Sequence, residues 1–142
     1  MFNSFEVIAS ALSSTRTRMN VLASNVANAQ TTRTPEGGPY KRRDVVQIAK
    51  SVKSSFGNVL DRMSLFRPSV QAVATDQSAP RMVFQPGHPD ANDDGYVAYP
   101  NINVVTTMTD MMTTARLYQA NLSALETARK MEQDATRISI RF

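Results

Sequence analysis

The sequence predicts a mainly α-helical fold with a small β insert, in which long N- and C-terminal helices pair as an antiparallel coiled coil. Apolar residues recur at alternating spacings of three and four at both ends of the chain, as in a heptad repeat. All seven prolines and all five glycines lie between residues 35 and 100, so both ends lack helix breakers. The 142 residues, 42% of them hydrophobic, are enough for one structural unit.

The first segment, residues 1–30, is expected to form one helix from about Ser4 to Ala29. Asn3 or Ser4 can cap its start. At 1.5 Å per residue the helix is roughly 39 Å long. Its seam is apolar apart from one threonine and consists of Phe5, Ile8, Leu12, Thr15, Met19, Leu22, Val26 and Ala29.

The middle segment, residues 31–100, is expected to be a loop and a small β region. Residues 34–39 contain two prolines and two glycines and predict a turn. Lys50–Asn58 is polar and weakly patterned, which is typical of a loop. Four short runs bounded by turn residues predict strands: Asp44–Ala49, Ser69–Thr75, Arg81–Gln85 and Gly95–Tyr99.

The last segment, residues 101–142, predicts a second helix, from Ile102 or Val105 to about Ile138 and close to 50 Å long. Its seam slips by one residue near Leu125, a stammer that would locally overwind a coiled coil. The seam positions are Val104, Met108, Met111, Ala115, Tyr118, Leu122 and Leu125, followed by Ala128, Met131, Ala135 and Ile138.

The composition leaves little material for enzyme chemistry. Cysteine is absent and His88 is the single histidine, so thiol catalysis, thiolate metal sites and a positioned histidine base are not expected. Residues 90–95 resemble the start of a calcium loop, but Asn101 stands where a bidentate Glu is needed, which favours a simple turn. We expect no catalytic residue, no metal, no cofactor and no small-molecule substrate.

Direct membrane insertion is also not expected. No apolar run approaches the roughly 18 residues that span a bilayer, and the first 20 residues lack the pattern of a cleaved signal peptide. The polar face of the first helix is dominated by Ser, Thr and Asn rather than Lys and Arg. This composition favours a partner helix over a membrane surface.

The net charge of +4 is concentrated in residues 31–62, around Lys41, Arg42 and Arg43. The long periodic segments are nearly neutral, whereas a helix that reads DNA would carry the basic residues itself. We therefore expect no nucleic acid as a partner. The cluster is interpreted as a solvated patch or as a contact with an acidic protein partner.

Apolar residues also lie outside both seams, among them Val7, Val21 and Leu117, together with several alanines. One antiparallel pair buries one stripe of each helix, so this surplus predicts further helix contacts. We expect the terminal helices to be covered by neighbouring molecules in an assembly.

Two segments resemble the signatures of the bacterial flagellar rod and hook axial proteins. Residues 22–29 (LASNVANA), followed by Thr31 and Thr32, resemble the N-terminal signature. Residues 100–108 (PNINVVTTM), leading into 115–121 (ARLYQAN), resemble the C-terminal one. Within the family, the loop 35–43 (PEGGPYKRR), residues 86–91 (PGHPDA) and the short chain are most similar to the proximal rod type, while residues 51–79 match no motif.

The resemblance implies a structural subunit of the proximal rod, the drive shaft of the flagellar basal body, which transmits torque. The implied partners are copies of itself, other rod proteins and, during secretion, the flagellar export apparatus. The implied location is the rod in the periplasmic space, reached without a cleaved signal peptide. Polar signature positions are expected to make hydrogen bonds between helices or subunits: Asn25, Asn28, Tyr118, Gln119 and Asn121.

Together, the seams and the signatures predict the residues that pack helices and subunits. Lys41, Arg42 and Arg43 are the candidates for a polar partner contact. The predicted interface residues are Phe5, Ile8, Leu12, Met19, Leu22, Asn25, Val26, Asn28, Val104, Met108, Met111, Ala115, Arg116, Tyr118, Gln119, Asn121, Leu122, Leu125 and Met131.

The alternative interpretation is a coiled-coil adaptor or regulatory protein outside the flagellum. Such a protein would form a discrete dimer or trimer at micromolar concentration. A nucleic-acid binder that uses Lys41–Arg43 would instead show binding that falls steeply with salt.

Overall fold

The computed structural model describes residues 2–51 and 66–139 of the chain. Within these ranges it contains helix α1 (Phe2–Ala27), helix α2 (Val104–Ser139) and four strands. The strands are β1 (Arg43–Ser51), β2 (Phe66–Thr75), β3 (Arg81–Phe84) and β4 (Tyr96–Tyr99). Both helices and all four predicted strands are confirmed. Lys50 and Ser51 continue β1 rather than starting a loop, and the rest of the predicted loop Lys50–Asn58 lies outside the described residues.

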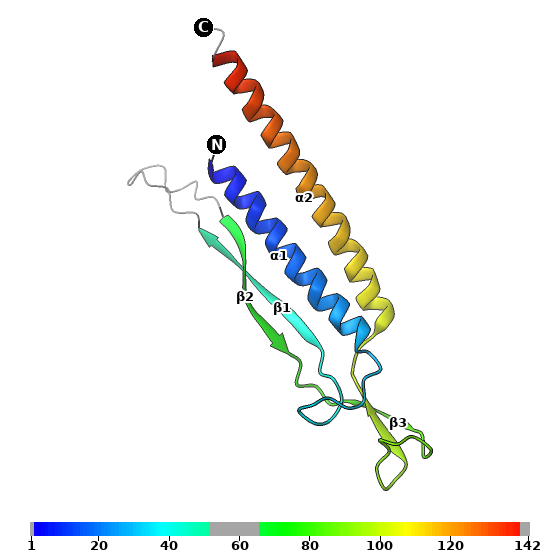
Figure 1. Ribbon diagram of the computed structural model, residues 1–142. Coiled ribbons are helices and arrows are strands. Elements are labelled where there is room, and N and C mark those ends of the chain that lie inside the picture. The colour runs from blue at the N-terminus through cyan, green and yellow to red at the C-terminus, as the bar shows by residue number, and fades with distance from the viewer. Residues whose placement is uncertain (1, 52–65, 140–142) are drawn as a thin grey trace.

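Helix α1 lies between α2 on one side and the β1–β2 hairpin on the other (Figure 1). The two helices run in opposite directions, so the described N- and C-terminal ends point the same way (Figure 1). Thr15, Leu22 and Ala29 of the predicted seam are buried and stand seven residues apart. Ser14 and Asn25 are also buried, three helical turns apart, on the side of the hairpin. Helix α1 therefore buries two faces, whereas a helix pair alone would bury one.

Strands β1 and β2 form an antiparallel ladder from Arg43↔Thr75 to Ser51↔Phe66. The register shifts between Val46 and Gln47, where β2 carries one extra residue. Such a bulge increases the local twist of a two-stranded ribbon. The twist fits the long hairpin to the cylindrical surface of α1 (Figure 1).

Strands β3 and β4 form a second, shorter hairpin, which projects from the lower end of the helix pair (Figure 1). Side chains alternate between its faces. Val97 is fully buried and pairs with Val83, whereas Met82, Phe84 and Tyr96 on the other face are exposed. The hairpin thus has one covered face and one apolar face open to solvent.

Among the described helices and strands, α2 packs against α1 alone. Asn103 caps its start, since Asn103 Oδ1 accepts the Thr106 N–H at 3.1 Å. Helix α2 has 36 residues and α1 has 26, so α2 is longer by about 15 Å at 1.5 Å per residue. None of the helices in the described ranges combines the length and hydropathy that would be needed to cross a membrane.

The buried face of α2 is rotated relative to the predicted seam. Its most buried residues are Thr107 and Thr114, whereas Val104, Met108, Leu122 and Met131 are exposed in the single chain. Most of the buried and half-buried positions again alternate by four and three: 107, 111, 114, 118, 121, 125 and 128, with 115 and 132 beside them. The heptad spacing is therefore present on α2, but the stripe that faces α1 is partly polar. Much of the apolar surface of α2 lies outside the contact with α1.

Candidate assembly interface

Asn25 joins the end of α1 to the start of β1. Its side chain is 1% exposed. Asn25 Nδ2 donates to the Arg43 carbonyl at 2.7 Å, and the Arg43 N–H donates to Asn25 Oδ1 at 3.0 Å. Tyr40 Oη donates to the same Oδ1 at 3.1 Å and lies 3.3 Å from Ser24 Oγ. The signature asparagine therefore satisfies a backbone segment of its own chain.

The turn after α1 is held by the other signature residues. Asn28 Nδ2 donates to the Ser24 carbonyl at 2.9 Å, and Thr31 Oγ1 donates to Asn28 Oδ1 at 3.3 Å. Thr32 Oγ1 donates to Asp90 Oδ2 at 2.8 Å, across 58 residues of sequence. The turn thereby fixes the loop between β3 and β4 relative to the helices.

The side chains of Tyr118, Gln119 and Asn121 make no hydrogen bond with another described residue. Tyr118 and Asn121 are half-buried on the side of α2 that packs on α1, and Gln119 is exposed. Their predicted hydrogen bonds between helices or subunits stay a prediction.

The predicted interface residues of α1 lie mostly inside the chain. Leu22 and Asn25 are buried, and the others are half-buried: Phe5, Ile8, Leu12, Met19, Val26 and Asn28. On α2 the set divides. Met111, Ala115, Tyr118, Asn121 and Leu125 are half-buried, whereas Val104, Met108, Arg116, Gln119, Leu122 and Met131 are exposed. The exposed group is free to contact a neighbour, and its role there stays a prediction.

The sequence pattern missed Thr107 and Thr114 as buried positions. Thr107 Oγ1 donates to the Asn103 carbonyl and Thr114 Oγ1 to the Asp110 carbonyl, both at 2.7 Å. A threonine that bonds the carbonyl four residues earlier has satisfied its donor, so its methyl can pack inward. Their spacing of seven residues is the signal in the sequence that could have identified them as buried positions.

The basic cluster is partly neutralised within the chain. Arg42 lies 2.8 Å from Asp44 Oδ2 and 3.6 Å from Asp76 Oδ2. Lys41 Nζ donates to Gln77 Oε1 at 3.2 Å, and the Arg43 guanidinium lies 5.8 Å from the centre of the Tyr40 ring. Among the described residues, neither Lys41 nor Arg43 pairs with a carboxylate. Their predicted contact with a polar partner stays a prediction.

Asp76 is held in its charged form beside this cluster. Ser78 Oγ and the Ser78 N–H both donate to Asp76 Oδ1, at 2.6 and 2.9 Å. These bonds, helped by the Arg42 guanidinium, lower the pKa of the Asp76 carboxyl below its ordinary value, against the opposing effect of desolvation.

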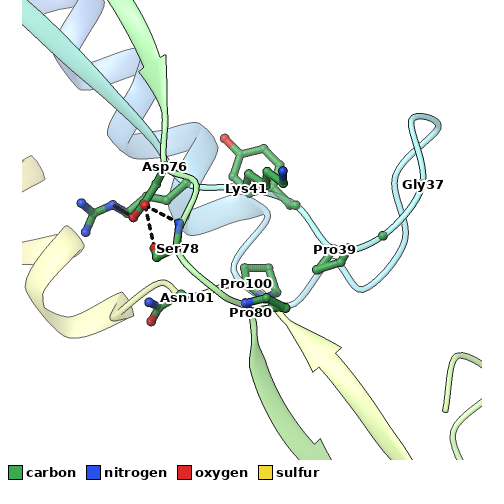
Figure 2. Close-up of a pocket in the computed structure, with 11 residues that line it drawn as sticks. Gly37, Pro39, Lys41, Asp76, Ser78, Pro80, Pro100 and Asn101 are labelled. Carbon is green, nitrogen blue, oxygen red and sulfur yellow. Dashed lines mark hydrogen bonds and ion pairs between the residues drawn. The ribbon is translucent and has the colours of Figure 1, made fainter. Parts of the chain in front are cut away.

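A pocket of about 180 Å³ lies next to Asp76, at the base of the β3–β4 hairpin (Figure 2). Pro80 stands just before β3 and Pro100 just after β4, and Pro39 and Lys41 complete the wall from the loop before β1 (Figure 2). The proline rings make the lining largely apolar, with one lysine at its edge. Arg42 and Asp76 also line the pocket, so charged groups of both signs stand at its wall.

The calcium-like residues form a turn. Asn92 Oδ1 accepts the N–H groups of Asp94 and Tyr96 at 3.2 and 2.7 Å, and Gly95 has φ +78°. This is the turn geometry that the sequence favoured over a calcium loop. In the described ranges, no three His, Cys, Asp or Glu side chains gather as metal ligands would.

Comparison with known proteins covers both ends of the chain. A family model described as "Flagella basal body rod protein" matches residues 5–33, and one described as "Flagellar basal body rod FlgEFG protein C-terminal" matches residues 93–138. The two signature segments lie inside these ranges.

Three curated relatives extend the likeness over nearly the whole chain. Each carries the name flagellar basal-body rod protein FlgC. The protein of Salmonella typhimurium is 36% identical over 132 residues, covering 92% of each chain. The Bacillus subtilis protein is 35% identical over 147 aligned residues, covering 96% of this chain and 97% of its own. The Borreliella burgdorferi protein is 32% identical over 148 aligned residues and 97% of each chain. The chain therefore belongs to the FlgC family of structural proteins of the bacterial flagellar basal-body rod.

Proposed function

We propose that this chain is built into the proximal rod by packing its two terminal helices against those of neighbouring rod subunits, and that it transmits torque there as part of the drive shaft. The partners are further copies of this chain and other rod proteins. Family membership supports the rod, and the exposed face of α2 supports the mode of assembly.

The observation that carries the proposal is the apolar stripe on the outside of α2. Val105, Met108 and Met112 are spaced i, i+3 and i+7, so they share one helix face. Val105 is 75% exposed and Met112 is 60% exposed. Leu122 continues this side of the helix near Met108, whereas Leu117 and Met131 are exposed on other sides of it. Full burial of such a side chain contributes about 1.5–3 kcal/mol, and these residues have gained only part of it in the single chain.

Coiled-coil packing is the geometry that we propose for these contacts. The inward positions of α2 keep a seven-residue repeat, as do Thr15, Leu22 and Ala29 on α1. A repeat of seven keeps two helices in register along their length. Packed in layers around an axis, such pairs resist twisting because every turn of helix meets a neighbour.

The same family membership supports a proposal about the route and the location. We propose that the chain passes through the flagellar export apparatus without losing a cleaved signal peptide and takes its place in the periplasmic space. N-terminal sequencing of the protein from purified basal bodies tests this. A sequence that begins within the first few residues is expected, and one that begins some 20 residues later contradicts it.

The assembly mode is tested by Leu122→Asp in a strain whose own gene is deleted. Leu122 is 40% exposed, so the variant should fold as a monomer while the charge opposes packing in the rod. We expect loss of motility and no variant in purified basal bodies. Gln71→Asp is the matched control, because it adds the same charge at an exposed polar position on β2, away from the proposed helix contacts. Normal motility of the Leu122→Asp strain would contradict the proposed helix contacts.

Leu22→Asp should behave differently. Leu22 is buried inside the single chain, so the substitution should lower the monomer's own helix content as measured by circular dichroism. The two leucines thus distinguish loss of folding from loss of assembly.

A further inference from the structure

The tip of the β3–β4 hairpin carries an exposed aromatic pair. Phe84 is 61% exposed, and its ring meets that of Tyr96 edge-on with centroids 5.3 Å apart. Met82 lies on the same face, two residues before Phe84, and is exposed as well. Large apolar side chains gathered on one open face are typical of an interaction surface.

Two acidic side chains lie in the turn that leads into Tyr96. Asp93 and Asp94 are exposed, and their carboxylates pair with no other described residue. Gly95, directly after Asp94 in the chain, packs closely on Phe84, because a Cβ on Gly95 would lie 3.0 Å from Phe84 Cε2. We call Met82, Phe84, Asp93, Asp94 and Tyr96 the hairpin knob.

The pocket at the base of the same hairpin has the complementary properties. Its wall includes Pro39, Pro80 and Pro100, which give it apolar surface, and its volume is about 180 Å³ (Figure 2). The Asp76 carboxyl also lines it, paired with Arg42. Lys41 stands at the pocket and pairs with no carboxylate in the described residues, whereas Arg42 is already paired with Asp44 and Asp76. We call this the base pocket.

We propose that the hairpin knob of one copy docks into the base pocket of a second copy of this chain. Phe84 would enter the proline-lined pocket, and Asp93 and Asp94 would face Lys41. Charge complementarity between two unpaired acids and an unpaired lysine favours a second copy as the occupant. This inference rests on the proposed function, in which copies lie side by side in the rod.

The geometry of the contact has a consequence for symmetry. Phe84 lies at the tip of β3 and Pro80 just before its base, so the knob and the pocket are different patches of one chain. A contact between different patches is heterologous and propagates from copy to copy as a ring or an open helix. The hairpin would thereby add a link between successive copies beside the helix contacts.

Charge reversal tests the contact in basal bodies purified from a deletion strain that expresses each variant. Lys41→Glu and Asp94→Lys should each lower the amount of this chain per basal body roughly tenfold, which corresponds to a loss of about 1.4 kcal/mol in binding free energy. The double variant should restore this amount, because each contact then again joins one acidic and one basic side chain, with the two positions exchanged. Lys50→Glu is the matched control, because Lys50 is an exposed cation on β1, away from the knob, the pocket and the apolar stripe of α2. Unchanged incorporation of both single variants, or no recovery in the double variant, overturns the proposal.

A disulfide test identifies the occupant. The chain has no cysteine, so Phe84→Cys combined with Asn101→Cys introduces the only two thiols. Oxidation of assembled rods should link two copies of this chain, because a disulfide needs Cα atoms within about 7 Å. A link to another flagellar protein, or no link, overturns the proposal. Absence of the unmodified chain from purified rods would instead contradict the proposed function itself.

Discussion

Asn25→Ala should remove the main polar link between α1 and the β1–β2 hairpin. The Asn25 side chain makes three hydrogen bonds, two with the backbone of Arg43 and one with the Tyr40 hydroxyl. The side chain is 1% exposed, so water does not replace it freely. The substitution leaves the backbone N–H and C=O of Arg43 without their partner.

The expected loss of unfolding free energy follows from these bonds. Each neutral hydrogen bond contributes about 1 kcal/mol net, which gives about 3 kcal/mol for the three bonds of Asn25. The better helix propensity of alanine offsets about 0.6 kcal/mol. We therefore expect a net loss of about 2–3 kcal/mol.

Urea unfolding followed by circular dichroism measures the loss. At a slope of about 1.5 kcal/mol per M, the midpoint should fall by about 1–2 M. Asn20→Ala is the matched control, since Asn20 is exposed on the same helix, and its free energy of unfolding should change by less than about 0.5 kcal/mol, a midpoint shift of about 0.3 M. If Asn25→Ala behaves like this control, the assigned role of the side chain is wrong.

A double-mutant cycle with Tyr40→Phe sharpens the test. Alone, Tyr40→Phe should cost about 1 kcal/mol, because it removes the hydroxyl that bonds Asn25 Oδ1. In the Asn25→Ala background its cost should be clearly smaller. Fully additive effects would show that the two side chains act independently.

Two further predictions concern turns. Gly95→Ala should lower the free energy of unfolding in urea by about 2 kcal/mol, because φ is +78° and the new Cβ would meet Phe84 at 3.0 Å. Gly87→Ala is the control and should change this free energy little, since its Cβ would meet nothing within 4 Å. Equal effects of the two substitutions would refute the reasoning. Ser78→Ala should raise the pKa of Asp76 toward its ordinary value in a carboxyl NMR titration, and an unchanged pKa would refute the assignment. Because the folded pKa is the lowered one, the contribution of Asp76 to stability is present above the unfolded pKa and is lost as pH falls through the folded value.

Local sequence features predicted the elements well. The absence of Pro and Gly from both ends left two uninterrupted helices, observed at Phe2–Ala27 and Val104–Ser139. The strands could be predicted because each is a short β-branched or aromatic run between turn residues. Their boundaries and the helix periods depend mainly on residues that are neighbours in sequence.

The orientation of α2 could not be predicted in the same way. Apolar seam residues such as Met108 and Leu122 are exposed, while Thr107 and Thr114 are buried. A hydrophobic pattern marks every helix face that can be buried, including faces that a neighbouring molecule could cover. Within a single chain, α2 has only α1 as a partner among the described helices and strands. The pattern therefore cannot assign which apolar stripe belongs to the partner helix of the same chain.

By itself, the sequence determined the two helices, the four strands, the turn at residues 90–95 and, through its signatures, the family. Only the folded structure shows that Asn25 bonds β1 rather than another helix, that α1 is covered on two sides, and that a pocket lies at the base of the β3–β4 hairpin. The physical reason is the separation along the sequence over which each effect acts. Periodicity and turn chemistry act over a few residues, whereas pairs such as Asn25 with Arg43, or Thr32 with Asp90, exist only after distant segments have been brought together.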